Sequence, residues 1–363
     1  MADGISHQST LTAEDGMANP NASFVPVLML HTFECLRNIV VTTWEDMLPI
    51  FDSLVLSANH HPTPNSITDN QGASTSQVTS SATATTPTAS EPPSAVADVS
   101  DVARATAAMI DDSCPKSGSS EDTAIFLMKL WQILLAIVPF CPYDHVAQDQ
   151  LIGVLESLRS LPETIIWIEE REVRLWKDFP LLSNHMRAAW VNPIHKSEMP
   201  QFMGSDEENV EQWVNLNAFA ARIMNKGFLN CSVFAFTEIV GALEDELPPT
   251  AGLVREYTIS VASHWISICG TQLFEDAFTG NTLTGTERQE IIPGPLYVGS
   301  GGQPGYSIDR WRFWQSQLAE FGNLGLNPIC LGASQAAHRM EEIMNQNDQA
   351  EASRLGTAQE HRP

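Results

Sequence analysis

The stretch LVREYTISVASHWISICGTQLFEDAF, residues 253–278, decides the fold class. Its large apolar side chains recur at helical spacing and cover most of the circumference of a helix; they are Val254, Tyr257, Val261, Trp265, Ile268, Cys269 and Leu273. A helix that is apolar on most sides is enclosed by other elements on most sides. The stretch therefore predicts a helix at the centre of an all-α bundle.

Shorter amphipathic runs precede and follow this stretch. Their apolar residues are three and four positions apart, the spacing of one helix face, over residues 28–39, 44–55, 126–138, 151–161, 181–190, 206–226, 233–243, 307–321 and 334–345. Residues 164–176 include the β-branched run TIIWI without a turn signal, so we expect them to be extended or irregular. One short candidate strand is not enough for a layered α/β sheet. The sequence also lacks a repeat of roughly 20–50 residues, which a solenoid would need. We predict one multi-helix, bundle-like domain.

Composition separates ordered from disordered parts of the chain. Residues 58–122 consist mainly of Ser, Thr, Ala, Pro and Asn and contain no Phe, Trp or Tyr. Such a segment buries too little surface to offset its ordering entropy, although a short helix around residues 99–110 is compatible with the pattern. We predict that the helices of the N-terminal part pack back onto the main domain. The predicted parts are a disordered N-terminus (1–23), N-terminal helices (24–57), a disordered insertion (58–122), the main helical domain (123–346) and a disordered tail (347–363).

The charge of the chain narrows the choice of partners. It has 44 acidic and 19 basic residues, a formal net charge of −25, and its basic residues occur singly or in pairs. Such a chain repels phosphate backbones and anionic lipids, so we expect no nucleic-acid and no membrane partner. The most apolar window, residues 125–140, contains Lys129 and Gln132 and is shorter than the ~20 residues of a bilayer-spanning helix.

The first residues and the cysteines predict the compartment. The start MADGISHQST has neither the basic nor the apolar region of a secretory signal. Six cysteines are scattered without a Cys-x-x-Cys pair, which is typical of reduced thiols rather than a disulfide framework. We therefore expect a soluble protein of the cytoplasm or nucleus, without a transmembrane segment.

Six aromatic-rich stretches occur in a recognisable order. They are LWQILLAIVP (130–139), QDQLIGVLESLRSLP (148–162), LWKDFPLLSNHMRAAW (175–190), WVNLNAFAARIMNKG (213–227), SVASHWISICGTQLFE (260–275) and GPLYVGSGGQPGYSIDRWRFWQSQLAEF (294–321). In this order the chain resembles, over residues 126–321, an uncharacterised family of filamentous fungi known as domain of unknown function 3632. The resemblance implies a largely helical fold and carries no assigned activity or site residue.

Two motifs that bear on phosphate and metal binding have structural explanations. The loop GSGGQPG, residues 299–305, precedes a helix, where phosphates often bind. However, Pro304 has no N–H to donate, and Asp309 in the first turn would repel an anion. His338 shares a helix face with Glu341 and Glu342, but a dimetal bundle site needs such a pattern on two helices. We predict a surface loop, no metal and no cofactor.

Four polar side chains in apolar surroundings are the candidates for a ligand site. Asn217 and Arg222 lie in the run NLNAFAARI, His264 lies in the central helix, and Arg310 precedes Trp311. A buried arginine can clamp a carboxylate or phosphate ligand, and it can equally form an internal ion pair or stack on tryptophan. For His264, a hydrogen bond inside the core is the simpler explanation. We predict no catalytic residue among the four.

The remaining polar positions are acidic clusters and threonines that precede prolines. The acidic clusters at 206–211 and 244–246 lie at predicted helix ends, where we expect them to be solvated. Thr63 and Thr86 each precede a proline in the insertion and are candidates for phosphorylation by a proline-directed kinase.

Two functional hypotheses remain open. The first is a helical scaffold or adaptor that binds another protein, motivated by nine tryptophans and a disordered insertion without a reactive cluster. It predicts an exposed apolar patch. The alternative is an enzyme or small-molecule-binding protein with a tryptophan-lined pocket. It predicts that at least two of Asn217, Arg222, His264 and Arg310 converge on one concave site.

Overall fold

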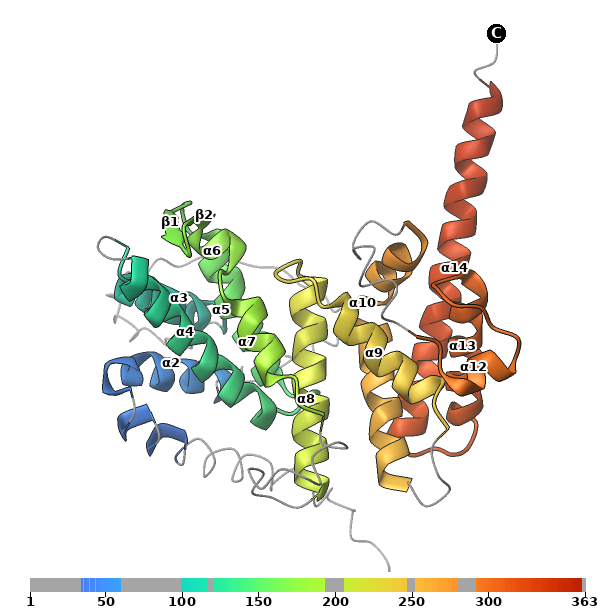
Figure 1. Ribbon diagram of the computed structural model, residues 1–363, viewed down its shortest axis with the longest axis horizontal. Helices are drawn as coiled ribbons and strands as arrows, with labels where there is room; N and C mark the ends of the chain where they lie inside the picture. The colour runs from blue at the N-terminus through green and yellow to red at the C-terminus, as the bar shows by residue number, and fades with distance from the viewer. Residues whose placement is uncertain are drawn as a thin grey trace, which may run out of the picture.

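The computed structural model describes residues 34, 36–38, 40–42, 44–59, 99–116, 120–192, 206–246, 252–279 and 292–360, and the described chain is mostly helical, as predicted (Figure 1). The elements are η1 (Glu45–Met47), α2 (Leu48–Asn59), α3 (Val99–Ser113), α4 (Ser120–Ile137), η2 (Val138–Phe140), α5 (Val146–Ser160), β1 (Ile165–Ile168), β2 (Arg171–Arg174), α6 (Leu175–Asp178), α7 (Leu182–Ala189), α8 (Asp206–Asn225), α9 (Ser232–Leu243), α10 (Gly252–Thr279), α12 (Pro295–Gly299), α13 (Ile308–Gly322) and α14 (Pro328–Glu360).

Helix α10 is the buried centre of the C-terminal half, as its apolar circumference predicts. It packs against α8, α9 and α14, and α13 packs against α14. Val261, Trp265 and Leu273 are fully buried. The helix is kinked at Cys269, where φ is −127° and ψ is 24°. A Cβ on the next residue, Gly270, would lie 3.0 Å from Ile343 of α14, so the glycine permits a close approach of the two helices.

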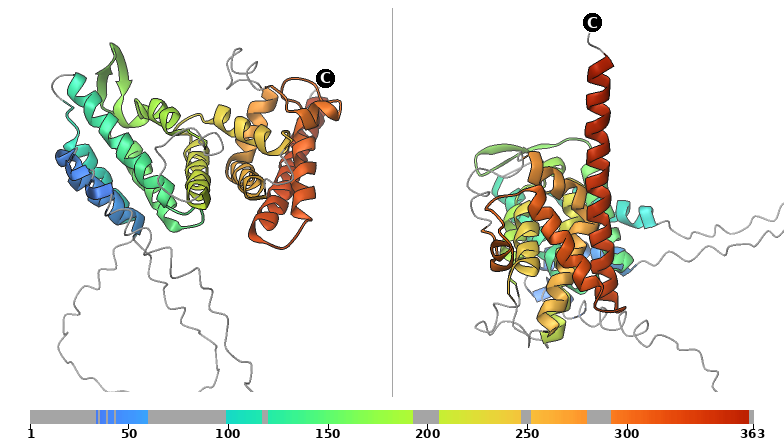
Figure 2. Two further views of the ribbon diagram at one scale, coloured as in Figure 1. Left: turned by 60° about the horizontal axis from the view of Figure 1, so that its bottom comes forward. Right: turned by 90° about the vertical axis from the view of Figure 1, so that its right-hand side faces the viewer.

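The N-terminal half is a second group of helices. Helices α2 and α3 pack on each other and on α5, while α4 packs against α7 and β1. Their buried residues are those that recur at helical spacing, such as Phe51, Leu54, Leu151 and Leu155. Helix α8 lies between the two halves, because it contacts η2 on one side and α10 on the other (Figures 1 and 2).

Helix α3 corrects the predicted boundary of the insertion at residue 122. Ala103, Ala107 and Ile110 are buried on one face of α3, and the hydroxyl of Thr106 lies 2.7 Å from that of Ser53. The alanines that made this segment look like low-complexity sequence are also the best helix formers and allow close packing. Residues 99–116 therefore belong to the folded part. The predictions for residues 60–98 lie outside the described residues, as do those for the N-terminal 23.

A β-hairpin occupies the stretch predicted to be extended or irregular. Strands β1 and β2 are antiparallel, with Ile165 opposite Arg174 and Ile168 opposite Arg171. The two residues between them, Glu169 and Glu170, have φ values of 49° and 64°. Left-handed backbone at both positions suits a two-residue hairpin turn, for which Asn-Gly is the usual sequence signal. Two glutamates gave no such signal.

The last helix extends beyond the predicted end of the domain at residue 346. Helix α14 begins at Pro328 and ends at Glu360, and Figure 1 shows that its C-terminal part projects beyond the other helices. Residues 347–355 contain Gln, Ala and Glu without a Gly or Pro, and such residues propagate a helix that is already formed. Residues 361–363 lie outside the described part.

Truncation of a buried side chain tests the inclusion of α3 in the fold. We expect Ile110→Ala to lower the free energy of unfolding by about 3 kcal/mol, because it leaves a cavity between α3 and its neighbours. Met109→Ala, on the exposed side of the same helix, should change it by less than about 0.5 kcal/mol. Urea denaturation followed by circular dichroism measures both, and equal effects would contradict the packing of α3.

Candidate functional site

The four polar residues predicted as a ligand site lie in two separate networks. Asn217 and Arg222 are on α8 and His264 is on α10, so these three belong to the layer where the two halves meet. Arg310 is on α13 and is paired with the end of α9. Each of the four side chains makes contacts that account for its position.

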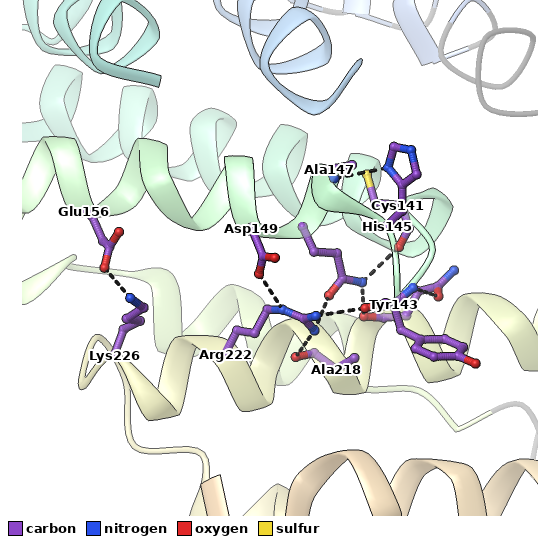
Figure 3. Close-up of polar contacts among 11 residues, drawn as sticks. Cys141, Tyr143, His145, Ala147, Asp149, Glu156, Ala218, Arg222 and Lys226 are labelled. Atoms are coloured by element: carbon purple, nitrogen blue, oxygen red, sulfur yellow. Dashed lines mark hydrogen bonds and ion pairs between the residues drawn. The ribbon is translucent and has the colours of Figure 1, made fainter. Parts of the chain in front are cut away.

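Arg222 connects α8 to the loop that precedes α5 (Figure 3). Its Nε donates to Asp149 Oδ1 at 3.0 Å, its Nη1 to Gln148 Oε1 at 3.0 Å, and its Nη2 to the carbonyl of Tyr143 at 2.8 Å. Gln148 in turn donates to the carbonyls of Cys141 and Asn215, each at 2.9 Å. This set of contacts satisfies backbone carbonyls where η2 gives way to α5. The guanidinium is therefore already engaged.

Asn217 is hydrogen-bonded within the core, and His264 packs against an aromatic ring. The His264 ring lies against the Tyr143 ring, with centroids 4.3 Å apart. Burial, with a smaller effect from Arg222, lowers the pKa of His264 to about 4, so the imidazole is neutral at pH 7. Asn217 accepts a hydrogen bond from Trp265 Nε1 at 2.8 Å and donates one to the carbonyl of Trp213 at 2.9 Å. Asn217 connects α8 to α10, whereas His264 packs α10 against the loop before α5.

Arg310 forms a buried ion pair that overturns the expectation for Glu244. The cluster 244–246 was predicted to be solvated, but the Glu244 side chain is 0% exposed. Arg310 donates from Nε to Oε1 at 2.6 Å and from Nη2 to Oε2 at 2.9 Å. Trp314 Nε1 donates to Oε1 at 2.6 Å, and the Gly294 amide to Oε2 at 2.7 Å. Four donated hydrogen bonds leave this carboxylate closed to a ligand.

The glycine-rich loop is shaped by the same ion pair. The guanidinium of Arg310 lies 5.4 Å from the centre of the Tyr297 ring and donates to the Gly305 carbonyl at 3.1 Å. A Cβ on Gly302 would come within 2.5 Å of the Tyr297 ring, and one on Gly294 within 2.6 Å of Glu244. The glycines allow the loop to close over the ion pair, which explains them without a phosphate.

A second buried carboxylate, Glu238, was missed by the reasoning from sequence. It lies on α9 among aromatic residues from four elements. We call this group the Glu238 cluster: Trp190, Trp213, Phe234, Glu238 and Tyr257. Trp190 follows α7, Trp213 is on α8, and Tyr257 is on α10. The ring of Trp190 is stacked on Phe234 with centroids 4.4 Å apart and lies 5.0 Å from Trp213.

Glu238 differs electrostatically from an ordinary glutamate. Glu238 is 8% exposed, and its burial raises the pKa of the carboxyl group from 4.5 to about 7. The nearby indole N–H groups of Trp213 and Trp190 have the opposite, smaller effect on this pKa. The carboxylate in turn raises the pKa of Tyr257, although burial is the larger cause there. One signal in the sequence could have found the site: Glu238 is the only charged residue in SVFAFTEIVGAL, residues 232–243.

The remaining predicted positions carry no further site. His338 Nε2 lies 3.5 Å from Glu342 and Nδ1 4.0 Å from Glu341, and all three side chains are exposed. Within the described ranges no group of three or more His, Cys, Asp or Glu is placed to hold a metal ion. Thr63 and Thr86 lie outside the described residues.

The fold and its polar networks define a mostly helical protein whose described core holds three buried carboxylates, Glu238, Glu244 and Asp276. A family model described as protein of unknown function (DUF3632) matches residues 131–318. The match covers more than half of the chain, and the chain belongs to this family. No curated protein and no solved structure matches it.

Removal of Arg310 tests the closed ion pair. We expect Arg310→Met to lower the free energy of unfolding by about 3–5 kcal/mol, because it leaves the buried Glu244 charge without a counter-ion. The double variant Glu244→Gln/Arg310→Met should recover part of this loss. Arg312→Met breaks an exposed pair with Asp309 and should cost less than about 1 kcal/mol. A loss for Arg310→Met no larger than for Arg312→Met in urea denaturation would contradict the assignment.

The pKa of Glu238 predicts a specific pH dependence. Because its pKa in the folded state lies above the ordinary value of 4.5, the folded protein loses stability as the pH rises to about 7, and the whole penalty is present above that. Glu238→Gln removes the charge. We compare the free energy of unfolding of this variant with that of the unchanged protein at each pH. The difference should favour the variant by about 3 kcal/mol more at about pH 8 than at about pH 4. Urea denaturation at both pH values measures the difference, and a pH-independent difference would exclude the raised pKa.

Proposed function

We propose that this chain is a helical protein-interaction domain that binds an extended segment of another protein at its β-hairpin. The observation that carries the proposal is the outer face of β1. Trp167 is 57% exposed and Ile165 is 46% exposed, whereas the alternate residues Ile166 and Ile168 are buried. The other eight tryptophans, all within described ranges, are buried or partly buried. Large exposed apolar side chains on a projecting hairpin are typical of a recognition surface (Figure 2).

The chemistry of the hairpin favours a basic and apolar partner segment. Ile165 and Trp167 are two residues apart, the spacing at which an extended peptide places side chains on one face. Exposed acidic residues lie beside them, since Glu172 is opposite Trp167 and Glu169 and Glu170 form the turn. The net charge of −25 attracts cationic partners more widely. An extended segment with alternating apolar and basic residues is therefore the proposed partner.

The pocket hypothesis built on Asn217, Arg222, His264 and Arg310 is disfavoured. Arg310 is enclosed with Glu244 in one network, while Asn217, Arg222 and His264 lie in another and have protein partners. Binding a ligand through Asn217, Arg222 or Arg310 would require breaking existing hydrogen bonds. We propose no catalytic role for them.

We also propose a soluble protein of the cytoplasm or nucleus. One stretch, Ser120–Phe140, is long and apolar enough to cross a membrane, but 56% of its most apolar window is buried. Leu127, Trp131 and Ile137 are fully enclosed by neighbouring helices, which supports a core helix. Five of the six cysteines are described, and each is a buried free thiol, which suits a reducing compartment.

Selection of peptides on the full chain tests the interaction surface. We expect a displayed library of random peptides to yield binders that alternate apolar and basic residues. The double variant Ile165→Ala/Trp167→Ala should weaken their binding by about tenfold or more, because aromatic anchors dominate such interfaces. Leu324→Ala/Leu326→Ala, which removes two exposed leucines elsewhere, is the matched control.

Two outcomes would overturn the hairpin proposal. One is equal affinity of the selected peptides for the hairpin variant and the control. The other is a concentration-dependent dimer that the hairpin variant abolishes, measured by light scattering, since it would assign the surface to a second copy of the chain.

A further inference from the structure

The Glu238 cluster collects buried polar groups that have no partner. Among the described residues, Trp190 Nε1, Trp213 Nε1 and the Tyr257 hydroxyl are buried without a hydrogen bond. Glu238 itself, more than nine-tenths buried, makes no ion pair with any described basic side chain. Unpaired buried polar groups are costly and rare in folded proteins, so several of them in one cluster require an explanation.

Glu244 shows what a purely structural buried carboxylate looks like in the same protein. It receives hydrogen bonds from Arg310, Trp314 and the Gly294 amide, and its charge is balanced by a guanidinium. Glu238 has neighbouring indoles of the same kind but lacks the cation. The difference between the two sites is one positive charge.

The buried Asp276 also has no cation among the described residues, but it accepts hydrogen bonds from Ser232 and Gln272. The Glu238 cluster differs from both sites because several polar groups around its carboxylate have no hydrogen-bond partner.

We propose that the Glu238 cluster is a binding site for a compact organic cation, a primary or methylated ammonium group. In this site the Glu238 carboxylate balances the positive charge, and the Tyr257 oxygen accepts a hydrogen bond from an N–H of the ligand. The rings of Trp190, Trp213 and Phe234 attract the cation through their π-systems. An ammonium group would therefore be attracted both by the negative charge of Glu238 and by the faces of the aromatic rings.

Two members of the cluster reach the surface of the protein. Trp190 and Phe234 are only partly buried, whereas Trp213 and Tyr257 are buried on the inner side. The cluster therefore meets the surface at the end of α7 and the side of α9. An anion would be repelled by Glu238, and a metal ion would find one carboxylate where it needs several oxygen ligands. An organic cation fits both the charge and the aromatic surroundings.

Titration with simple amines tests the site. The probes are methylammonium and tetramethylammonium chloride, with tert-butanol as a neutral compound of similar size and sodium chloride at matched ionic strength. Intrinsic tryptophan fluorescence and calorimetry follow binding to the full chain. We expect saturable binding of at least one ammonium probe and none of tert-butanol. Glu238→Gln should weaken it at least tenfold, whereas the exposed Glu320→Gln should leave it unchanged.

The pH dependence supplies a second readout. Tyr257 from α10 is the titratable group that faces Glu238, while α8 and the end of α7 present Trp213 and Trp190. Tyr257 stays neutral in the range of interest, so Glu238 alone changes charge. Binding should weaken as the pH falls from about 8 to about 5, because Glu238 gains a proton while the amine stays charged.

Two further arms identify the source of the cation and separate this site from the hairpin. A short peptide with lysine or trimethyllysine, compared with the free amines, shows whether the ammonium belongs to a protein or a metabolite. Binding of either supports the site. Ile165→Ala/Trp167→Ala should not alter amine binding, so the two proposals can fail separately.

The overturning results are equally specific. Absence of saturable binding by every ammonium probe would overturn the proposal, as would equal binding by tert-butanol. Binding unaffected in Glu238→Gln would do the same. Trp213→Phe, which removes one indole N–H and keeps an aromatic ring, should also weaken binding and provides a second variant if Glu238→Gln does not fold.

Discussion

Burial of α10 on almost every side is the constraint to which the other helices conform. A helix with apolar residues around most of its circumference is stable only when neighbours cover those residues, and here α8, α9 and α14 cover most of them, while polar residues such as Ser267 and Glu275 stay exposed. Each polar atom within that contact needs a partner in the same layer. Trp265 finds Asn217 on α8, and His264 finds the ring of Tyr143 in the loop before α5. The positions of Asn217 and His264, two of the residues that looked functional in the sequence, therefore follow from burying the central helix.

Among the buried carboxylates of this core, Glu244 and Glu238 meet the cost of desolvation in different ways. A buried carboxylate is stable when hydrogen-bond donors and a counter-ion replace the water it loses. Glu244 has both, and Arg310 and Trp314 of α13 are tied through it to the end of α9. Glu238 has only neutral neighbours, so its charged form is disfavoured and its pKa is raised. The first arrangement stabilises the fold, while the second weakens it near neutral pH.

The fold class could be predicted from periodicity, whereas local details required the tertiary structure. The apolar circumference of residues 253–278 was enough to identify a buried helix. A short helix was compatible with residues 99–110, but its packing was not predicted, because alanine suits both a close-packed helix and low-complexity sequence and only the contacts of α3 with α2 and α5 distinguish them. Similarly, the partner of Glu244 is 66 residues away, so its position at a helix end gave the wrong expectation of solvation. Glu238 is one charge within an apolar helix, and it was not predicted as a site because it is not part of a motif of paired residues.

The contrast between the two carboxylates bears on why a destabilising group is present at all. A glutamine at position 238 would keep nearly the same shape without the cost of burying a charge. Stability alone therefore favours the amide. Ligand-binding sites commonly contain polar groups that lower the stability of the fold, because a group whose hydrogen bonds are all made within the protein cannot bond to a ligand. The hairpin follows the same logic at the surface, since Trp167 exposes an apolar ring that folding alone would have buried. In both places the fold leaves an interaction incomplete, and a binding partner would complete it.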